Sequence, residues 1–208
     1  MKIKIAILVL FTLLVSPALK AQLGVNAGCN FARFGGINTG NMYEVSLAGF
    51  SGGLFYDKQI VHYLDLRAGV MYSPKGSCLK YENSYSSIYE KTFVKYIEIP
   101  VQIKANAGPF SALGGIYGAY ALKSYSTYQA KGLSGGFIVT DDFTNLRRID
   151  FGLKVGAGYQ YKVGPVKIFT QGDYSLGLLN INNTDAEQND KLRNKVFSLS
   201  VGALINIF

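Results

Sequence analysis

The last twelve residues, F-S-L-S-V-G-A-L-I-N-I-F at 197–208, alternate apolar side chains with small or polar ones. Because successive side chains of a strand point to opposite faces, this order predicts a strand with one apolar and one polar face. Such a strand suits a β-barrel that spans an outer membrane, with its apolar row against lipid. The final residue, Phe208, is out of phase with that row. Its phase leaves open whether it serves as the signal for the barrel-assembly machinery that would insert the chain.

The amino terminus has the three parts of a secretory signal peptide. Lys2 and Lys4 form a charged start, residues 5–15 are apolar, and residues 16–22 are small or polar. The apolar run is shorter than the ~20 residues that a spanning helix needs. The sequence therefore predicts export, with removal of residues 1–21 and a mature barrel domain over residues 22–208.

Seven further segments have the length and composition of strands. They lie at residues 23–32, 47–58, 62–73, 93–104, 111–122, 149–161 and 166–178. All alternate apolar and polar side chains except the segment 111–122, which is rich in Gly and Tyr and has no clear faces. Strands of about 10 to 14 residues exceed the ~5–6 residues usual in soluble sheets and match tilted strands that cross a bilayer.

The connections between these segments alternate in length. Short ones are expected at residues 57–61, 106–109 and 162–165, and long ones at residues 33–46, 74–92, 123–147 and 179–195. Short periplasmic turns and long outer loops are typical of outer-membrane barrels. The fold prediction is therefore all-β: a monomeric, eight-stranded, antiparallel, up-and-down transmembrane β-barrel with both termini in the periplasm.

The polar row of each strand should face the barrel interior, which in an eight-stranded barrel is filled by side chains and forms no channel. The charged members of this predicted interior network are Asp65, Arg67, Glu98, Lys104, Asp150, Lys154, Lys167 and Asp173. Acids and bases are equal in number, so ion pairs can offset the cost of burying charge. A charged interior also disfavours one alternative, a secreted lipocalin-like barrel that binds a small ligand.

The net charge and the two cysteines argue against nucleic-acid binding and against a disulfide. Removal of Lys2, Lys4 and Lys20 lowers the net charge from +8 to +5, because 18 basic residues then face the same 13 acidic ones. No basic cluster of the kind that binds nucleic acid is present. A disulfide between Cys29 and Cys78 is conceivable in an exported chain. However, Cys29 lies in the lipid-facing row and Cys78 in an expected loop, which favours two unpaired residues.

No catalytic, cofactor or metal site is predicted. The single histidine, His62, falls in an expected periplasmic turn, whereas a hydrolase site would need it beside Ser or Asp near the outer rim. This placement argues against a lipid-modifying barrel enzyme. The long connection 74–92 contains Tyr81, Tyr85 and Tyr89 among serines, a composition typical of recognition surfaces. These tyrosines are candidate surface contacts, and a merely solvated loop is the alternative.

The segment K-Y-I-E-I-P-V-Q-I-K at residues 95–104 resembles the signature of the PorT-like outer-membrane β-barrel domain family of Bacteroidetes. Similar motifs occur at residues 150–153, 156–159 and 174–181, and the resemblance covers essentially the whole mature chain. It implies an outer-membrane location. The founding member is linked to protease secretion through the type IX system, so the resemblance also implies an alternative role, as an accessory of a secretion or envelope-assembly complex.

The leading functional expectation is a small barrel without catalytic activity that acts structurally or through contacts at the cell surface. Its expected partners are outer-membrane lipid, the barrel-assembly machinery during insertion and an envelope or secretion protein.

Overall fold

The computed structural model describes residues 21–36, 42–83, 86–130, 137–140, 143, 146–183 and 191–207. The regular structure in these ranges is entirely β. The strands are β1 (Ala21–Gly35), β2 (Met42–Val45), β3 (Leu47–Val61), β4 (Leu64–Asn83), β5 (Ser86–Ala107), β6 (Phe110–Ala130), β7 (Phe137–Thr140), β8 (Ile149–Val163), β9 (Val166–Gly177) and β10 (Arg193–Asn206). No helix in the described ranges is long and apolar enough to span a membrane.

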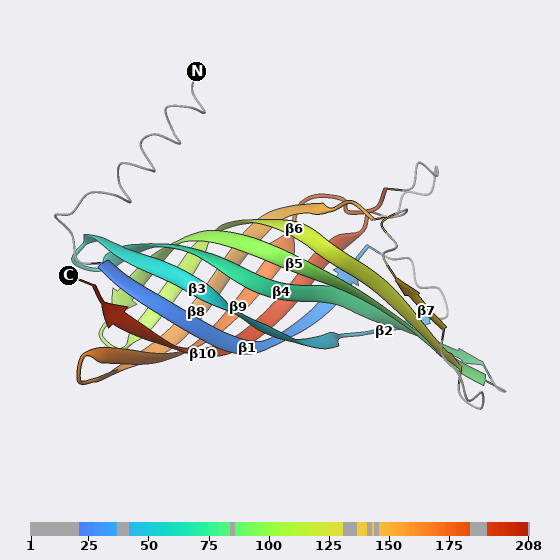
Figure 1. The fold of residues 1–208 in the computed structure, drawn as a ribbon, viewed down its shortest axis with the longest axis horizontal. Helices are drawn as coiled ribbons and strands as arrows, with labels where there is room; N and C mark the ends of the chain where they lie inside the picture. Colours follow the sequence, from blue (N-terminus) through green and yellow to red (C-terminus); the bar gives the residue numbers. More distant parts are fainter. Residues whose placement is uncertain are drawn as a thin grey trace, which may run out of the picture.

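Eight of the strands form a closed barrel (Figure 1). Strands β1, β3, β4, β5, β6, β8, β9 and β10 pair antiparallel in chain order, and β10 returns to pair with β1. The closing ladder runs from Gln22↔Asn206 to Gly35↔Arg193. The predicted fold class, an eight-stranded antiparallel up-and-down barrel, is therefore confirmed. The last strand, β10, is the segment expected at residues 197–208, although Phe208 lies outside the described residues.

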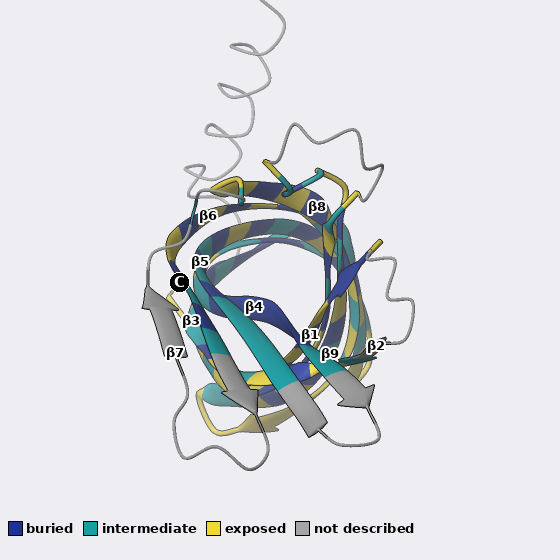
Figure 2. Cartoon of the chain, turned by 90° about the vertical axis from the view of Figure 1, so that its right-hand side faces the viewer, coloured by how far each residue is buried: buried dark blue, intermediate teal, exposed yellow. Residues whose placement is uncertain are grey.

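The outer wall of the barrel is apolar. Along β8 the exposed side chains of Ile149, Phe151, Leu153 and Val155 alternate with inward-facing residues. The same alternation continues around the wall, and Figure 2 shows it as buried and exposed segments that follow one another along the strands. Phe50, on β3, has an exposed fraction of 66%. Aliphatic and aromatic side chains exposed on every side form the surface that a bilayer core requires.

The first and last described residues, Ala21 and Ile207, and the tight turns lie at one end of the barrel, which we call the terminal end (Figure 1). Gly108 and Gly164 have φ angles of +60°, which lets the chain reverse within two residues. The third turn differs from the prediction. Residues 57–61 continue β3, and the chain reverses at His62 and Tyr63 instead.

Three strands run far beyond the barrel at the opposite, distal end. Strands β4, β5 and β6 have 20, 22 and 21 residues, whereas about 9–11 suffice to cross a membrane. Two short strands add to their edges, because β2 pairs with β4 and β7 pairs with β6. We call β2, β7 and the distal parts of β4, β5 and β6 the extended sheet.

The extended sheet corrects two predictions. The connection expected as a loop over residues 74–92 is instead a continuous hairpin, paired as far as Asn83↔Ser86. Much of the loop expected over 123–147 is likewise strand, in β6 and β7. Beyond the membrane both faces of a sheet can be polar, so the apolar alternation that marks a spanning strand is lost there. Cys78 therefore lies in β4 and is buried, with both Cys29 and Cys78 as free thiols.

Strand β4 bends inward as it leaves the barrel wall (Figure 2). Its ladder with β3 ends at Gly52↔Tyr72. From β1, the Asn30 side-chain amide reaches past β3 and donates to Ser73 Oγ at 3.0 Å and to the Pro74 carbonyl at 3.1 Å. Gly49 of β3 leaves room for this approach, since a Cβ there would lie 2.8 Å from Pro74 Cγ. The bend carries the next residue of β4, Lys75, into the barrel interior.

Candidate functional site: the lumen and the outer wall

The first charged layer of the lumen surrounds Arg67, near the terminal end. Its guanidinium donates to Asp57 through Nε, at 2.6 Å, and through Nη2, at 2.7 Å. Lys104 Nζ lies 3.2 Å from the same carboxylate. Arg67 Nη1 also donates to Gln171, whose side-chain amide donates in turn to Asp173. We call these five side chains the Arg67 layer. A two-pronged guanidinium–carboxylate pair fixes the geometry as well as the charge balance.

An apolar cluster supports the Arg67 layer. Phe55, Phe169 and Leu204 are buried together inside the barrel. The Arg67 guanidinium carbon lies 4.1 Å from the centroid of the Phe55 ring and 5.5 Å from that of Phe169. Gly24 leaves space for this packing, because a Cβ at that position would overlap the Phe55 ring. The lumen therefore mixes stacked aromatic and charged groups, as a packed core does.

A second charged layer surrounds Lys75, closer to the distal end. Lys75 Nζ lies 3.0 Å from Glu98 Oε2 and 3.0 Å from Asp150 Oδ2. Lys154 Nζ lies 2.7 Å from the other Glu98 oxygen. Tyr117 OH donates to Asp150 at 3.1 Å, and the Lys75 ammonium lies 4.0 Å from the centroid of the Tyr117 ring. We call these five side chains the Lys75 layer. Glu98 is only 1% exposed, so its charge depends on the two lysines.

The distal mouth of the barrel is closed by apolar side chains. The members of this apolar plug are Phe34, Val94, Tyr96, Tyr117, Ala119, Ala121 and Ile181. Ile181 comes from the segment that follows β9, and it is fully buried. Its backbone N–H donates to the Leu192 carbonyl at 2.9 Å, and its carbonyl accepts from Arg147 N–H at 2.7 Å. These bonds hold the segment across the mouth.

The terminal end is more open and holds a polar hollow of about 320 Å³, which we call the vestibule. Its lining residues are Gln22, Asp57, Gln59, His62, Asp65, Asn106, Gln160, Lys162, Lys167 and Asn206. His62 thus lines the same hollow as two carboxylates, Asp57 and Asp65. None of these lining residues carries a hydroxyl or a thiol. In the part of the chain that the structure describes, no group of His, Cys, Asp and Glu is placed to hold a metal ion.

The residues that the sequence predicted for the lumen occupy two environments. Six of the eight are buried: Arg67, Glu98, Lys104, Asp150, Lys154 and Asp173. The other two, Asp65 and Lys167, are half-buried and line the vestibule.

The predicted network lacked two charged members of these layers, Asp57 and Lys75. Asp57 was placed on the polar row of the strand expected at residues 47–58 and also at the start of the turn 57–61, but it was left out of the predicted network. Lys75 was assigned to a loop. For Asp57 the phase was the available signal, since it is two residues from the inward-facing Phe55 on the same strand. Lys75 enters the lumen through the bend of β4.

The tyrosines predicted as surface contacts lie on the extended sheet or outside the described residues. Tyr89 belongs to β5, and its ring centroid lies 5.7 Å from Lys80 Nζ. The backbone of Tyr81 lies in β4, paired with Ile88. Tyr85 lies outside the described residues. Tyr81 and Tyr89 therefore lie in the β4–β5 hairpin and not in the loop that was expected over residues 74–92.

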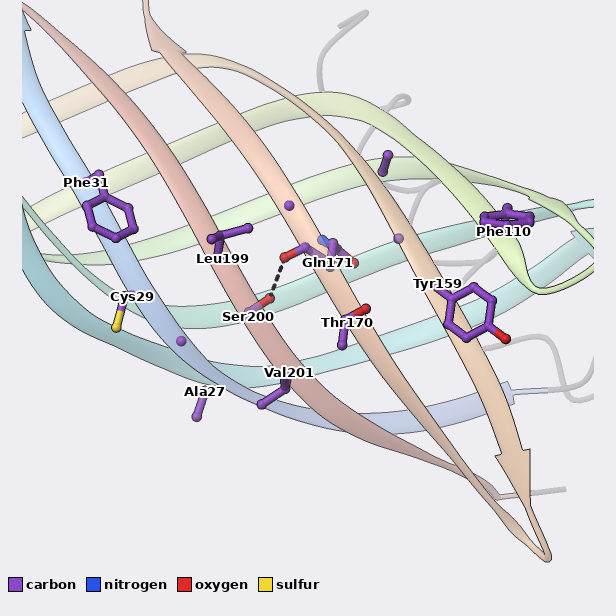
Figure 3. A pocket seen from close by; sticks show the side chains of 14 residues that line it. Ala27, Cys29, Phe31, Phe110, Tyr159, Thr170, Gln171, Leu199, Ser200 and Val201 are labelled. Carbon is purple, nitrogen blue, oxygen red and sulfur yellow. Dashed lines mark hydrogen bonds between the residues drawn. The ribbon is translucent and has the colours of Figure 1, made fainter.

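The outer wall also carries hollows. One, of about 650 Å³, spans β1, β8, β9 and β10 (Figure 3). Small side chains such as Ala27 and Ala157 form its floor between larger ones such as Phe31, Tyr159 and Leu199. In Figure 3 the labelled side chains of Phe31 and Tyr159 stand at opposite sides of it. A shallow apolar hollow on a lipid-facing wall matches the shape and chemistry of acyl chains.

A closed barrel with an apolar outer wall and a filled, charged lumen defines a membrane-spanning β-barrel protein. The chain belongs to the outer membrane protein beta-barrel domain family, whose model matches residues 16–183. It is a small outer-membrane protein. No curated protein matches the sequence.

Solved structures of other outer-membrane barrels have a similar fold. Neisserial surface protein A is 16% identical, with a TM-score of 0.45, and the match covers 89% of this chain and 96% of that one. Ail of Yersinia pestis, solved with the heparin analogue sucrose octasulfate, is 12% identical, with a TM-score of 0.45 and coverage of 90% and 99%. OprG of Pseudomonas aeruginosa is 11% identical, with a TM-score of 0.43 and coverage of 91% and 95%.

Proposed function

We propose that this protein is a non-enzymatic barrel that anchors the extended sheet at the cell surface, where the sheet contacts a partner. One observation carries the proposal: β4, β5 and β6 are roughly twice as long as a bilayer requires. About ten residues of each strand extend beyond the barrel, which corresponds to roughly 30 Å of sheet. A barrel whose only role lay within the bilayer would not need such an extension.

The filled lumen supports an anchoring role. The Arg67 layer, the Lys75 layer and the apolar plug follow one another along the barrel axis. Side chains that are packed and ion-paired across the interior make the barrel rigid and exclude a wide water path. The barrel would then act as a fixed base from which the extended sheet projects.

The extended sheet has features that suit protein recognition. In the described ranges, β2 pairs only with β4, and β7 pairs only with β6, so the sheet has two open edges. Unpaired backbone groups on such edges can pair with a strand of a partner. Its outer face carries aromatic side chains, including Phe93 stacked on Tyr125 with ring centroids 5.0 Å apart. Tyr89 and the neighbouring strands supply further contact area.

The orientation in the membrane is part of the proposal. We infer that residues 1–21 are removed as a signal peptide and that the terminal end faces the periplasm, which places the extended sheet outside the cell. The tight turns and both ends of the described chain, Ala21 and Ile207, lie at the terminal end and support this orientation, since outer-membrane barrels keep their short turns in the periplasm. The mature protein would act as a monomer, inserted by the barrel-assembly machinery.

A second candidate is an accessory of a secretion or envelope-assembly complex, as in the PorT-like proteins of Bacteroidetes. The vestibule favours it, because a polar hollow of about 320 Å³ at the terminal end would face periplasmic partners. Residues 95–104 carry the sequence resemblance to that family.

Photo-crosslinking in intact cells tests both candidates. One variant carries a photoreactive phenylalanine analogue at Tyr125 on the extended sheet, a second at Lys162 in the vestibule, and a control at Tyr161 on the outer wall. The surface role predicts a defined protein adduct from Tyr125 alone, and the accessory role predicts one from Lys162. Absence of a protein adduct from both positions would contradict both roles.

A further inference from the structure

Four cationic side chains form a row just beyond the apolar wall of β5, β6 and β8. Lys95 of β5 lies opposite Lys123 of β6 in the strand register. On the other side of β6, the Arg148 carbonyl accepts from Ala121 N–H at 2.7 Å, which places Arg147 and Arg148 at the same level. We propose that this row binds the phosphate-bearing headgroup of a membrane lipid, whose acyl chain lies along the wall beneath.

Two adjoining hollows provide space for such a lipid. The lower one, of about 480 Å³, is apolar and is lined chiefly by Ile97, Ile99, Ile116, Ile149 and Phe151. The upper one, of about 620 Å³, is lined by both arginines, two asparagines and apolar side chains. Tyr120 and Ile149 line both hollows, so the two adjoin. An apolar hollow therefore borders a cationic one.

The arginines are suited to phosphate by chemistry and by position. A guanidinium presents several N–H donors in a planar fork that matches phosphate oxygens. The Arg148 guanidinium carbon lies 4.0 Å from the centroid of the Phe143 ring, a contact that orients the side chain in the pocket. Asn180 and Asn183 line the same pocket and carry further polar groups.

The charge of the row is available to a ligand. Among the described residues, no carboxylate forms an ion pair with Lys95, Lys123, Arg147 or Arg148. Both arginines are exposed, as is Lys123. Each cation near a membrane surface strengthens the binding of an anionic lipid about fivefold.

An amphiphile suits this site better than a soluble anion or a protein. The lower hollow lies on the lipid-facing wall, where the exposed side chains of Ile99, Ile116 and Ile149 would contact acyl chains. The upper hollow borders that wall through Tyr120 and Ile149, and both arginines line it. A molecule with an anionic head and an aliphatic tail would contact both parts simultaneously.

The test measures lipid retained by the full-length, detergent-solubilised protein with native mass spectrometry. The probes are dioleoyl phosphatidic acid and dioleoylglycerol, which share acyl chains and differ in the phosphate. Phosphatidic acid should remain bound at concentrations where dioleoylglycerol does not. A difference in gel mobility between unheated and boiled samples shows that each variant is folded.

Two variants, each with a matched control, test separately the binding of the lipid headgroup and of its acyl chain. Arg147→Gln with Arg148→Gln should weaken retention of phosphatidic acid about thirtyfold. The matched control, Lys162→Gln with Lys167→Gln, removes the same charge at the terminal end and should leave retention unchanged. Gly118→Leu places a side chain in the lower hollow, where a Cβ meets nothing within 4 Å, and should weaken retention without changing charge. Gly114→Leu, equally unobstructed but outside both hollows, is its control.

Three outcomes would overturn the proposal. Equal retention of the two probes would show that the phosphate is not recognised. Unchanged retention in the folded double arginine variant would exclude the cationic pocket. Displacement of phosphatidic acid by millimolar inorganic phosphate, together with no effect of Gly118→Leu, would assign the row to a free anion. None of these outcomes bears on the extended sheet, which is tested separately by crosslinking.

Discussion

Asp57 and Arg67 are directly opposite each other on β3 and β4, and their side chains form a two-pronged ion pair inside the barrel, with N–O distances of 2.6 and 2.7 Å. The strand register creates this pair, because two residues on paired strands with the same inward phase must meet. Lys104 approaches the same carboxylate at 3.2 Å. Asp57 therefore balances two buried cations, and its loss should be costly.

Asp57→Ala should lower the free energy of unfolding by about 3–5 kcal/mol, because Arg67 and Lys104 would remain buried without a carboxylate partner. Urea titration in phospholipid vesicles, with heat-dependent gel mobility as the readout, measures this change. Asp65→Ala provides the control, since Asp65 is only half-buried and accepts one hydrogen bond from Asn106. Equal effects of the two substitutions would contradict the importance of the Arg67 layer.

Lys75→Met should destabilise the barrel by a similar amount, about 3–5 kcal/mol, since Asp150 would lose its ammonium partner. Combining it with Asp150→Asn should recover at least half of that loss, because Glu98 keeps Lys154 and no acid is left unpaired. A double-mutant cycle of urea midpoints measures the coupling. Strictly additive effects would show that the two side chains do not interact.

Gly24→Ala should destabilise the barrel by about 1–3 kcal/mol, because the added methyl group would overlap the Phe55 ring. Phe55→Leu in the same chain should restore part of the loss by removing the overlap. The control is Gly114→Ala, where a Cβ meets nothing within 4 Å. The packing of Phe55 against Gly24 would be disproved if both alanine variants unfolded at the same urea concentration.

Removal of the distal hairpin should leave the barrel intact. Ser77 and Thr92 are register partners, so residues 78–91 can be replaced by an Asn-Gly turn that closes the shortened hairpin. The shortened protein should still reach the outer membrane and migrate differently before and after boiling, while the crosslink from Tyr125 is lost. A shortened protein that kept the same crosslink would show that the contact at Tyr125 does not require the β4–β5 hairpin.

The membrane-spanning part of the fold was predictable from the sequence because lipid constrains every strand in the same way. Alternation identified β8 and β9 nearly to their ends, and the polar row indicated Arg67, Glu98 and Lys154 as interior residues. Beyond the bilayer a strand no longer needs an apolar row, so its sequence no longer alternates in the same way. The polar hairpin that contains Cys78 has no apolar row, and it was therefore assigned to a loop.

Other features of the lumen and of the outer wall could not be predicted, because they depend on contacts between residues distant in the sequence. Lys75 enters the lumen because β4 bends over Gly49 and is held by Asn30, and no local pattern signals that bend. Ile181 closes the distal mouth because its segment folds back and pairs with Leu192 and Arg147. The cationic row also joins Lys95 to Arg148 across three strands, so it becomes visible only once the register is known.

The position of the extended sheet outside the cell is tested most directly by labelling intact cells with a membrane-impermeant maleimide. Cys29→Ala and Cys78→Ala give a cysteine-free chain, into which Lys91→Cys, on the extended sheet, or Lys162→Cys, at the terminal end, is introduced. The protein with the cysteine at position 91 should be labelled in intact cells, and that with the cysteine at position 162 only after the outer membrane is permeabilised. Labelling at position 162 but not at position 91 in intact cells would contradict a surface-exposed sheet.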